Sequence, residues 1–118
     1  MIKTFGEYVR QRRERLFAKD RSYSVRQVAQ RVGFQPSYLS KVERGEVAPP
    51  SEERIVSLAR ELDEDPDVLL AMAGKVSGDL QQVIRRRPAL FARLIRELKD
   101  MPDHAVLRLV REVRDGDW

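Results

Sequence analysis

Apolar residues recur at helical spacing along most of the chain, most clearly in two short runs within residues 24–45. The apolar positions of these runs are Val25, Val28, Ala29 and Val32, followed by Leu39 and Val42. Gly33 separates the two runs and can adopt the positive φ that a sharp turn requires. Two short helices joined by such a turn, with a polar outer face on the second, are typical of a helix-turn-helix. This arrangement can place its second helix in the major groove of DNA.

Start and stop signals divide the first part of the chain into five predicted helices. Thr4 with Glu7, and Ser24 with Gln27, have the spacing of a capping box. Pro36 occupies a first helical position, where its missing N–H costs nothing. The predicted helices cover about residues 4–17, 24–32, 35–44, 51–62 and 65–73, with a polar connection at 18–23. Because the sequence shows no strand-like alternation, the predicted fold class is all-α.

Residues 75–118 form a separate predicted region with three further helices. The last two of these place large apolar residues at positions i, i+3, i+4 and i+7 along one face. These residues are Phe91, Leu94, Ile95 and Leu98, followed by Val106, Leu109, Val110 and Val113. The two faces can pack on each other as a hairpin within one chain, or two such hairpins can form a four-helix interface between copies. We favour dimerisation through this region.

Charge is distributed unevenly along the chain. Residues 1–45 carry 11 Lys and Arg against 4 Asp and Glu, residues 46–74 carry 2 against 8, and residues 75–118 carry 10 against 7. The positive excess therefore coincides with the helix-turn-helix pattern, where nucleic-acid phosphates would be bound. Arg-rich helix surfaces are also commonly just solvated, so the charge alone is a weak indication.

Composition excludes several classes of site. The chain has no cysteine, and His104 is its single histidine, so disulfides, thiolate metal sites and a zinc site of its own are excluded. With no cysteine nucleophile and no Gly-rich phosphate loop, we expect neither an enzyme nor a metal or cofactor. No run approaches the roughly 18 apolar residues of a membrane span, and the first residues lack a signal-peptide segment. We therefore expect a soluble cytoplasmic protein.

Residues 5–74 resemble the helix-turn-helix of phage Cro and repressor proteins, the XRE family. The matching segments read FGEYVRQRRE, SVRQVAQRVGFQPSYLSKVERG and LARELDEDPDVLL, and SYLSKVERG is the most specific part. The resemblance implies a five-helix, lambda-repressor-like DNA-binding domain, here residues 1–74. A C-terminal helical segment, residues 75–118, follows it and is only loosely similar to the dimerisation tails of some family members.

Residues that read bases are expected on the exposed N-terminal face of the second helix of the motif. The candidates are Gln35, Pro36, Ser37, Ser40 and Lys41. In the family, the positions equivalent to Pro36, Ser37 and Lys41 commonly face bases. Pro36 can offer only apolar contact, so Ser37 and Lys41 are expected to make the hydrogen bonds, with Gln35 next.

Four further residues are candidates for contacts with phosphates. Ser24 and Arg26 lie at the start of a helix, where free N–H groups and the helix dipole attract anions. The resemblance adds Arg44, which directly follows the second helix of the motif. It also favours a phosphate contact for the hydroxyl of Tyr38 over packing of its ring under the turn.

The resemblance also implies a structural ion pair between Arg13 of the first helix and Glu43 at the end of the third. Two features depart from the family pattern. Val25 stands where the family usually has a glutamine that contacts a phosphate, which puts that contact in doubt. The connection at residues 18–23 is longer than the usual turn, and either extends the first helix or lies near the DNA backbone.

These features together predict a sequence-specific DNA-binding transcriptional regulator. The expected form is a repressor that binds a palindromic operator in double-stranded DNA as a homodimer, because one helix-turn-helix reads too few base pairs alone. The alternative is an antitoxin-type or adaptor protein. Its C-terminal helices, within residues 75–118, would bind a partner protein, and DNA binding would serve autoregulation.

Overall fold

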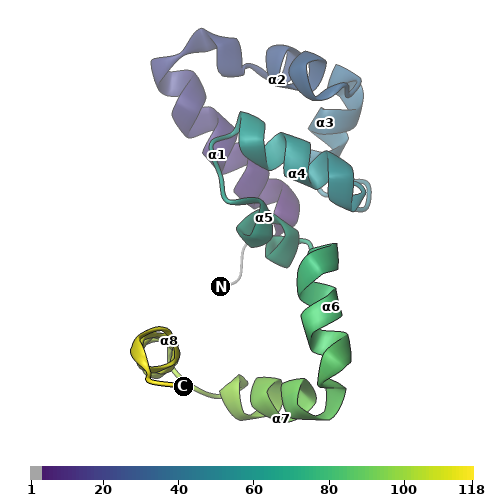
Figure 1. The fold of residues 1–118 in the computed structure, drawn as a ribbon. Coiled ribbons are helices and arrows are strands. Elements are labelled where there is room, and N and C mark those ends of the chain that lie inside the picture. The colour runs from purple at the N-terminus through teal and green to yellow at the C-terminus, as the bar shows by residue number, and fades with distance from the viewer. Residues whose placement is uncertain (1–3) are drawn as a thin grey trace. The chain divides into compact units, whose positions relative to one another are not determined.

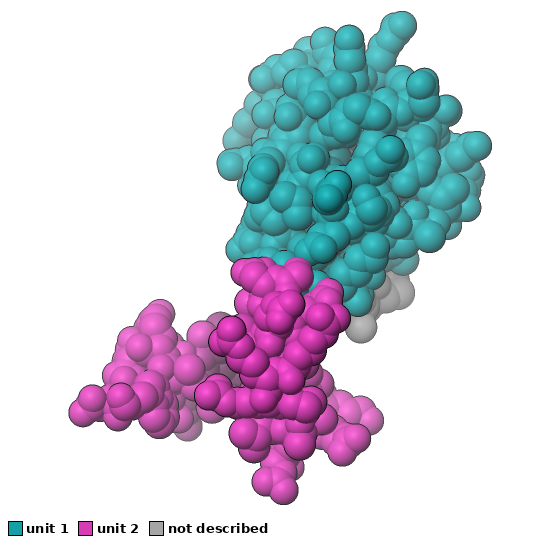
Figure 2. All heavy atoms as spheres, turned by 45° about the vertical axis from the view of Figure 1, so that its right-hand side comes forward, with its two compact units in different colours: residues 1–77 teal, residues 78–118 magenta. Residues whose placement is uncertain are grey.

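The computed structural model describes residues 4–118, which form α-helices and one 3₁₀ turn with no strand among them (Figure 1). The elements of the first compact unit are α1 (Phe5–Lys19), η1 (Arg21–Tyr23), α2 (Val25–Val32), α3 (Pro36–Glu43), α4 (Glu52–Glu61) and α5 (Pro66–Met72). The elements of the second are α6 (Gly78–Arg86), α7 (Pro88–Leu98) and α8 (Asp103–Asp115). Figure 2 colours the two units, which divide after residue 77. The predicted all-α fold class is confirmed.

Local signals explain where the helices of the motif begin and end. The backbone N–H of Glu7 donates to Thr4 Oγ1 at 3.2 Å, and the N–H of Gln27 donates to Ser24 Oγ at 3.2 Å. Each bond satisfies a donor that the first helical turn leaves unpaired. Gly33 ends α2 with a φ of 78°, a left-handed conformation that a residue with a side chain rarely adopts. Pro36 then opens α3.

The connection between α1 and α2 is ordered and partly helical. The sequence predicts that the first helix ends near residue 17, whereas α1 continues to Lys19. Asp20 follows, and its carboxylate accepts a 2.9 Å hydrogen bond from the backbone N–H of Ser22. This bond from the backbone lowers the pKa of Asp20. The extra residues thus extend α1 and then form η1, which leads directly into the cap of α2.

The apolar core lies in the first unit and joins all five of its α-helices. Its buried side chains are Phe5, Val9, Val28, Ala29, Phe34, Leu39, Val42, Ile55, Leu58, Ala59, Leu62, Leu69 and Leu70. Within this unit α1 packs against α3 and α5, and α2 packs against α3 and α4. The core therefore fixes the α2–α3 pair on a scaffold of three other helices.

The second unit has no comparable core, since none of residues 78–118 is buried. Its α6 contacts α7, and the apolar faces of α7 and α8 remain open to solvent.

Across residues 4–118, none of the helices combines the length and the hydropathy that crossing a membrane would need.

Candidate nucleic-acid interface

The turn at Gly33 sets α3 against α2 with its N-terminal end exposed. Gln35, Pro36, Ser37 and Lys41 are exposed, whereas Ser40 is half-buried. On the opposite side of α3, Leu39 and Val42 are fully or almost fully buried in the core. Helical periodicity therefore leaves one polar face of α3 accessible, and the five predicted base-reading residues lie along it or at its start.

Gln35 takes the N-cap position of α3 but does not use its side chain there. Its backbone is extended, with φ −70° and ψ 139°, and the side chain makes no capping hydrogen bond. The next residue, Pro36, has no N–H to be capped. The amide of Gln35 is therefore exposed and not engaged in holding the start of the helix.

Tyr38 lies between the core and the surface. Its ring meets the buried ring of Phe34 edge to face, with centroids 5.1 Å apart and an interplanar angle of 87°. The guanidinium carbon of Arg54 lies 5.5 Å from the centroid of the Phe34 ring. Phe34 lies outside the two helical runs of the sequence, whereas the structure makes it a core residue whose ring packs against Tyr38. An aromatic residue next to the turn glycine is the signal that could have indicated this role.

The four candidates for phosphate contact have different surroundings. Ser24 caps α2, Arg26 is exposed on the first turn of α2, and the ring of Tyr38 is half-buried. Arg44 is exposed and forms an ion pair with Glu46, with N–O distances of 2.9 and 3.2 Å. The bond from Arg44 lowers the pKa of Glu46. The Arg44 guanidinium is thus held beside the end of α3 by a carboxylate that is itself exposed.

Arg13 of α1 and Glu43 at the end of α3 form a buried, bidentate ion pair. Arg13 Nε donates to Glu43 Oε2 at 2.7 Å, and Nη2 donates to Oε1 at 2.9 Å. A third bond, from Nη1 to the backbone carbonyl of Tyr23, is 3.2 Å long. The hydrogen bonds to Glu43 raise the pKa of Arg13 further above its ordinary value. One guanidinium therefore links α1, η1 and α3.

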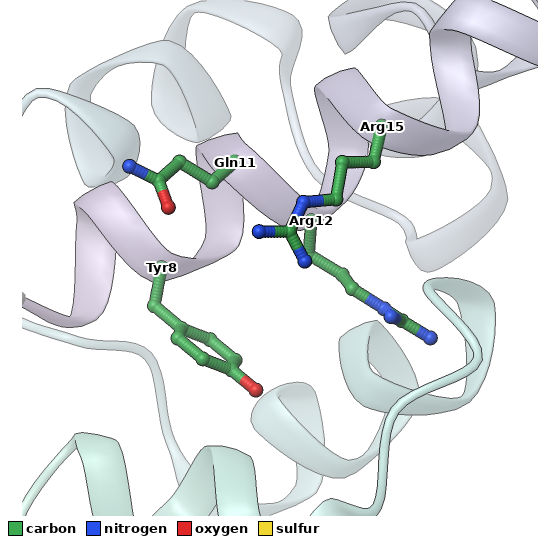
Figure 3. A pocket seen from close by; sticks show the side chains of 4 residues that line it. All are labelled: Tyr8, Gln11, Arg12 and Arg15. Carbon is green, nitrogen blue, oxygen red and sulfur yellow. The ribbon is translucent and has the colours of Figure 1, made fainter.

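A second polar cluster ties α1 to the turn between α4 and α5. Figure 3 shows the side chains of Tyr8, Gln11, Arg12 and Arg15 lining a small pocket on α1. Tyr8 Oη donates to Glu64 Oε2 at 2.5 Å, while Arg12 donates to the backbone carbonyls of residues 62 and 63 at 3.0 and 2.6 Å. The Tyr8 hydrogen bond lowers the pKa of Glu64 and raises that of Tyr8. Sequence reasoning missed this cluster because its partners lie 50 or more residues apart.

Arg31 belongs to a further set of contacts around η1. Its guanidinium pairs with Glu61, donates to the backbone carbonyl of Ser22 at 2.7 Å, and lies 5.1 Å from the centroid of the Tyr23 ring. These contacts and the Arg13 bond to Tyr23 hold η1 from two sides.

Within residues 4–118, no group of three or more His, Cys, Asp or Glu side chains is arranged to hold a metal ion.

Comparison with known families agrees with this geometry. Residues 4–72 match the family described as a helix-turn-helix domain, which falls within the XRE-like clan. The match spans more than half of the chain and includes α1 to α5. No curated protein and no solved structure matches the chain.

Proposed function

This chain belongs to the helix-turn-helix domain family, whose domain implies DNA binding, and from that premise we propose a sequence-specific transcriptional repressor. It binds a palindromic operator in double-stranded DNA as a homodimer. The observation that carries this proposal is the polar, exposed face of α3, fixed to α1 by the buried pair of Arg13 and Glu43. The chain acts by binding, without catalysis and without a cofactor.

Ser37 and Lys41 are the main base-reading residues in this proposal. They are four residues apart, so their side chains extend from the same face of α3. The Lys41 ammonium can donate to the O6 and N7 edge of guanine in the major groove, and Ser37 can donate or accept. Pro36 contacts a thymine methyl, while Gln35 and Ser40 contribute at the two margins of the same face.

Phosphate contacts hold α3 in register on the duplex. Arg26 and Ser24 approach one phosphate at the start of α2, where the positive end of the helix dipole also favours an anion. Arg44 and the Tyr38 hydroxyl bind the backbone near α3. Since exposed ion pairs are weak, a phosphate can replace Glu46 as the partner of the Arg44 guanidinium.

The second unit supplies the dimer interface in this proposal. Side chains of α7 and α8 line one open apolar groove, namely Leu94, Leu98, Val106, Leu109, Val110 and Val113. Leu94, Ile95, Val110 and Val113 are 43% to 58% exposed. Phe91 and Leu98 are also incompletely buried. A second copy that covers these faces would remove the apolar surface from water, and the two pairs of helices would form a four-helix interface. We assign dimerisation to residues 75–118 and DNA binding to residues 1–74.

Selection from a random pool of duplexes tests the function directly. We expect the full chain to enrich one palindrome whose half-sites are centred about 10 base pairs apart, the spacing of one helical turn. Binding should weaken steeply as salt is raised, because phosphate contacts release counterions. A pool that shows no enriched sequence after several rounds would contradict sequence-specific regulation.

The same open groove favours a second candidate, an antitoxin-type or adaptor protein. An amphipathic helix from another protein would cover the α7 and α8 faces as well as a second copy would. Sedimentation of the purified chain distinguishes the two. A monomer at tens of micromolar, together with binding to a half-site only, would favour the partner-binding alternative.

A further inference from the structure

A shallow groove beside the reading helix contains a polar residue that the contacts above do not use. The groove is lined by Arg26 and Gln30 of α2, by Phe34 in the turn and by Pro36 at the start of α3. We propose that this groove binds the sugar–phosphate backbone of DNA and that Gln30 is a further phosphate-contacting residue. The inference rests on the DNA binding proposed above and names an additional contact of the same interface.

The chemistry of the groove fits a phosphodiester. Arg26 and Gln30 are four residues apart, so both side chains lie on one face of α2, and both are exposed. Within residues 4–118, neither side chain has a hydrogen-bond or ion-pair partner. The Arg26 guanidinium supplies positive charge, and the Gln30 amide supplies two N–H donors without charge. The Arg26 guanidinium and the Gln30 amide can therefore each donate a hydrogen bond to one of the two non-bridging oxygens of a single phosphate.

The apolar side of the groove is rigid. Phe34 is buried, its edge-to-face contact with Tyr38 fixes its orientation, and the guanidinium of Arg54 lies 5.5 Å from its centroid. Pro36 has a ring that cannot rotate away, and it lacks the N–H that would otherwise bind an anion at this end of α3. An apolar surface of this kind suits the face of a deoxyribose, while the phosphate is held by the α2 side chains.

Dimensions also place the groove at the backbone rather than at the bases. An α-helix with its side chains is about 10–12 Å across, and the major groove is about 12 Å wide, so α3 fills it. No room is left in the groove for α2, so the side chains of α2 that reach DNA meet the sugar–phosphate backbone and not the base edges. Because α2 packs on α3 and Gln30 shares the groove with Pro36, Gln30 faces the DNA strand nearest the N-terminal end of α3.

The test uses the full chain, the selected operator and an unrelated duplex. We expect Gln30→Ala to weaken binding of the dimer to both duplexes about 100-fold, because each of the two subunits loses one hydrogen bond to a charged group and each loss costs about tenfold. The slope of log K against log salt should stay unchanged, because a neutral amide releases no counterion. Arg26→Ala should reduce the slope by about 1.8, since each of the two subunits loses one phosphate contact worth about 0.9. Gln30→Glu should weaken binding more than Gln30→Ala. Gln82→Ala and Gln82→Glu are matched controls on an exposed position of α6.

Phosphate ethylation interference locates the contact. One ethylated phosphate in each half-site should impair binding of the unaltered chain, and it should impair binding of Gln30→Ala by a smaller factor, because only the Arg26 contact then remains to be lost. Operator binding by Gln30→Ala equal to that of the unaltered chain would overturn the inference. So would a loss confined to one base pair, since Gln30 would then read a base. If the unaltered chain binds no duplex, the proposed function itself is contradicted, which is a different result.

Discussion

Gly6 in α1 lies against the backbone of Val42 in α3 so closely that no side chain fits between them. A Cβ at Gly6 would lie 2.2 Å from the carbonyl oxygen of Val42 and 2.7 Å from that of Glu43. Both obstructing atoms belong to the backbone, so they cannot rotate away as a flexible side chain would. The two helices therefore approach at a distance that only glycine permits, and this contact positions the C-terminal end of α3.

Gly6→Ala should consequently destabilise the first unit. Forcing α1 and α3 apart costs about 3 kcal/mol, the upper end for overpacking, because the obstructing atoms belong to the backbone, and the better helix propensity of alanine returns only about 1 kcal/mol. We expect a net loss near 2 kcal/mol in the free energy of unfolding, measured by urea denaturation. Gly78→Ala is the control, because a Cβ there meets nothing within 4 Å. Equal stability of Gly6→Ala and the unaltered chain would contradict the close approach.

The buried pair of Arg13 and Glu43 gives a second prediction. Arg13→Met leaves the Glu43 carboxylate buried without its partner, Glu43→Met does the same to the Arg13 guanidinium, and each loss costs about 3–5 kcal/mol. Replacing both residues with methionine removes both buried charges, so the double variant should regain much of that loss. Urea denaturation of the two single variants and the double variant gives the coupling energy. The exposed pair of Arg44 and Glu46 is the control, where Glu46→Ala should have little effect on stability.

The sequence predicted the motif well because its signals are local. The Ser24 cap, the turn at Gly33 and Pro36 at the start of α3 depend on neighbours within a few residues, and the structure has each of them. Contacts between distant residues were not predictable in this way. The bond from Tyr8 to Glu64 spans 56 positions, and either residue alone reads as an ordinary surface side chain. The burial of Phe34 in the core was not predictable either, because helical periodicity does not describe a residue within a turn.

The bond from Tyr8 to Glu64 makes a prediction about pH. The pKa of Glu64 is lowered in the folded state by the Tyr8 hydroxyl. The ionised Glu64 carboxylate therefore contributes to stability fully above the ordinary glutamate pKa of about 4.3. This contribution is lost as pH falls through the lower pKa of Glu64 in the folded state. Tyr8→Phe should reduce stability by about 1 kcal/mol at neutral pH, and this difference should shrink toward pH 2.

Urea denaturation between pH 2 and pH 7 measures that difference. Tyr23→Phe is the control, since it keeps the ring that faces Arg31 and leaves the Glu64 bond intact. Its stability difference from the unaltered chain should not vary across the same interval. A Tyr8→Phe difference that is constant with pH would show that the hydroxyl does not favour the charged form of Glu64.

Lys41 and Arg26 should differ in how their loss affects recognition. Lys41→Ala should relax the preference at one position of each half-site by about 1–3 kcal/mol, because a base contact is lost. Arg26→Ala should weaken binding to operator and unrelated DNA by similar factors, because a phosphate contact carries no sequence information. Affinities for a panel of single-base operator variants separate these outcomes. A uniform effect of Lys41→Ala across the panel would assign Lys41 to the backbone instead.

The open apolar faces of α7 and α8 give the last prediction, which concerns assembly. Leu94→Asp combined with Val110→Asp places two charges in the proposed interface, at positions already 43% and 53% exposed in the single chain. Helicity should therefore persist while the dimer dissociates, and operator affinity should fall on the order of 100-fold as the linked second half-site is lost. Circular dichroism, sedimentation equilibrium and operator titration measure these three effects. Ala92→Asp combined with His104→Asp adds two carboxylates outside the groove and should leave the dimer intact. A Leu94→Asp, Val110→Asp chain that still sediments as a dimer would place the interface elsewhere.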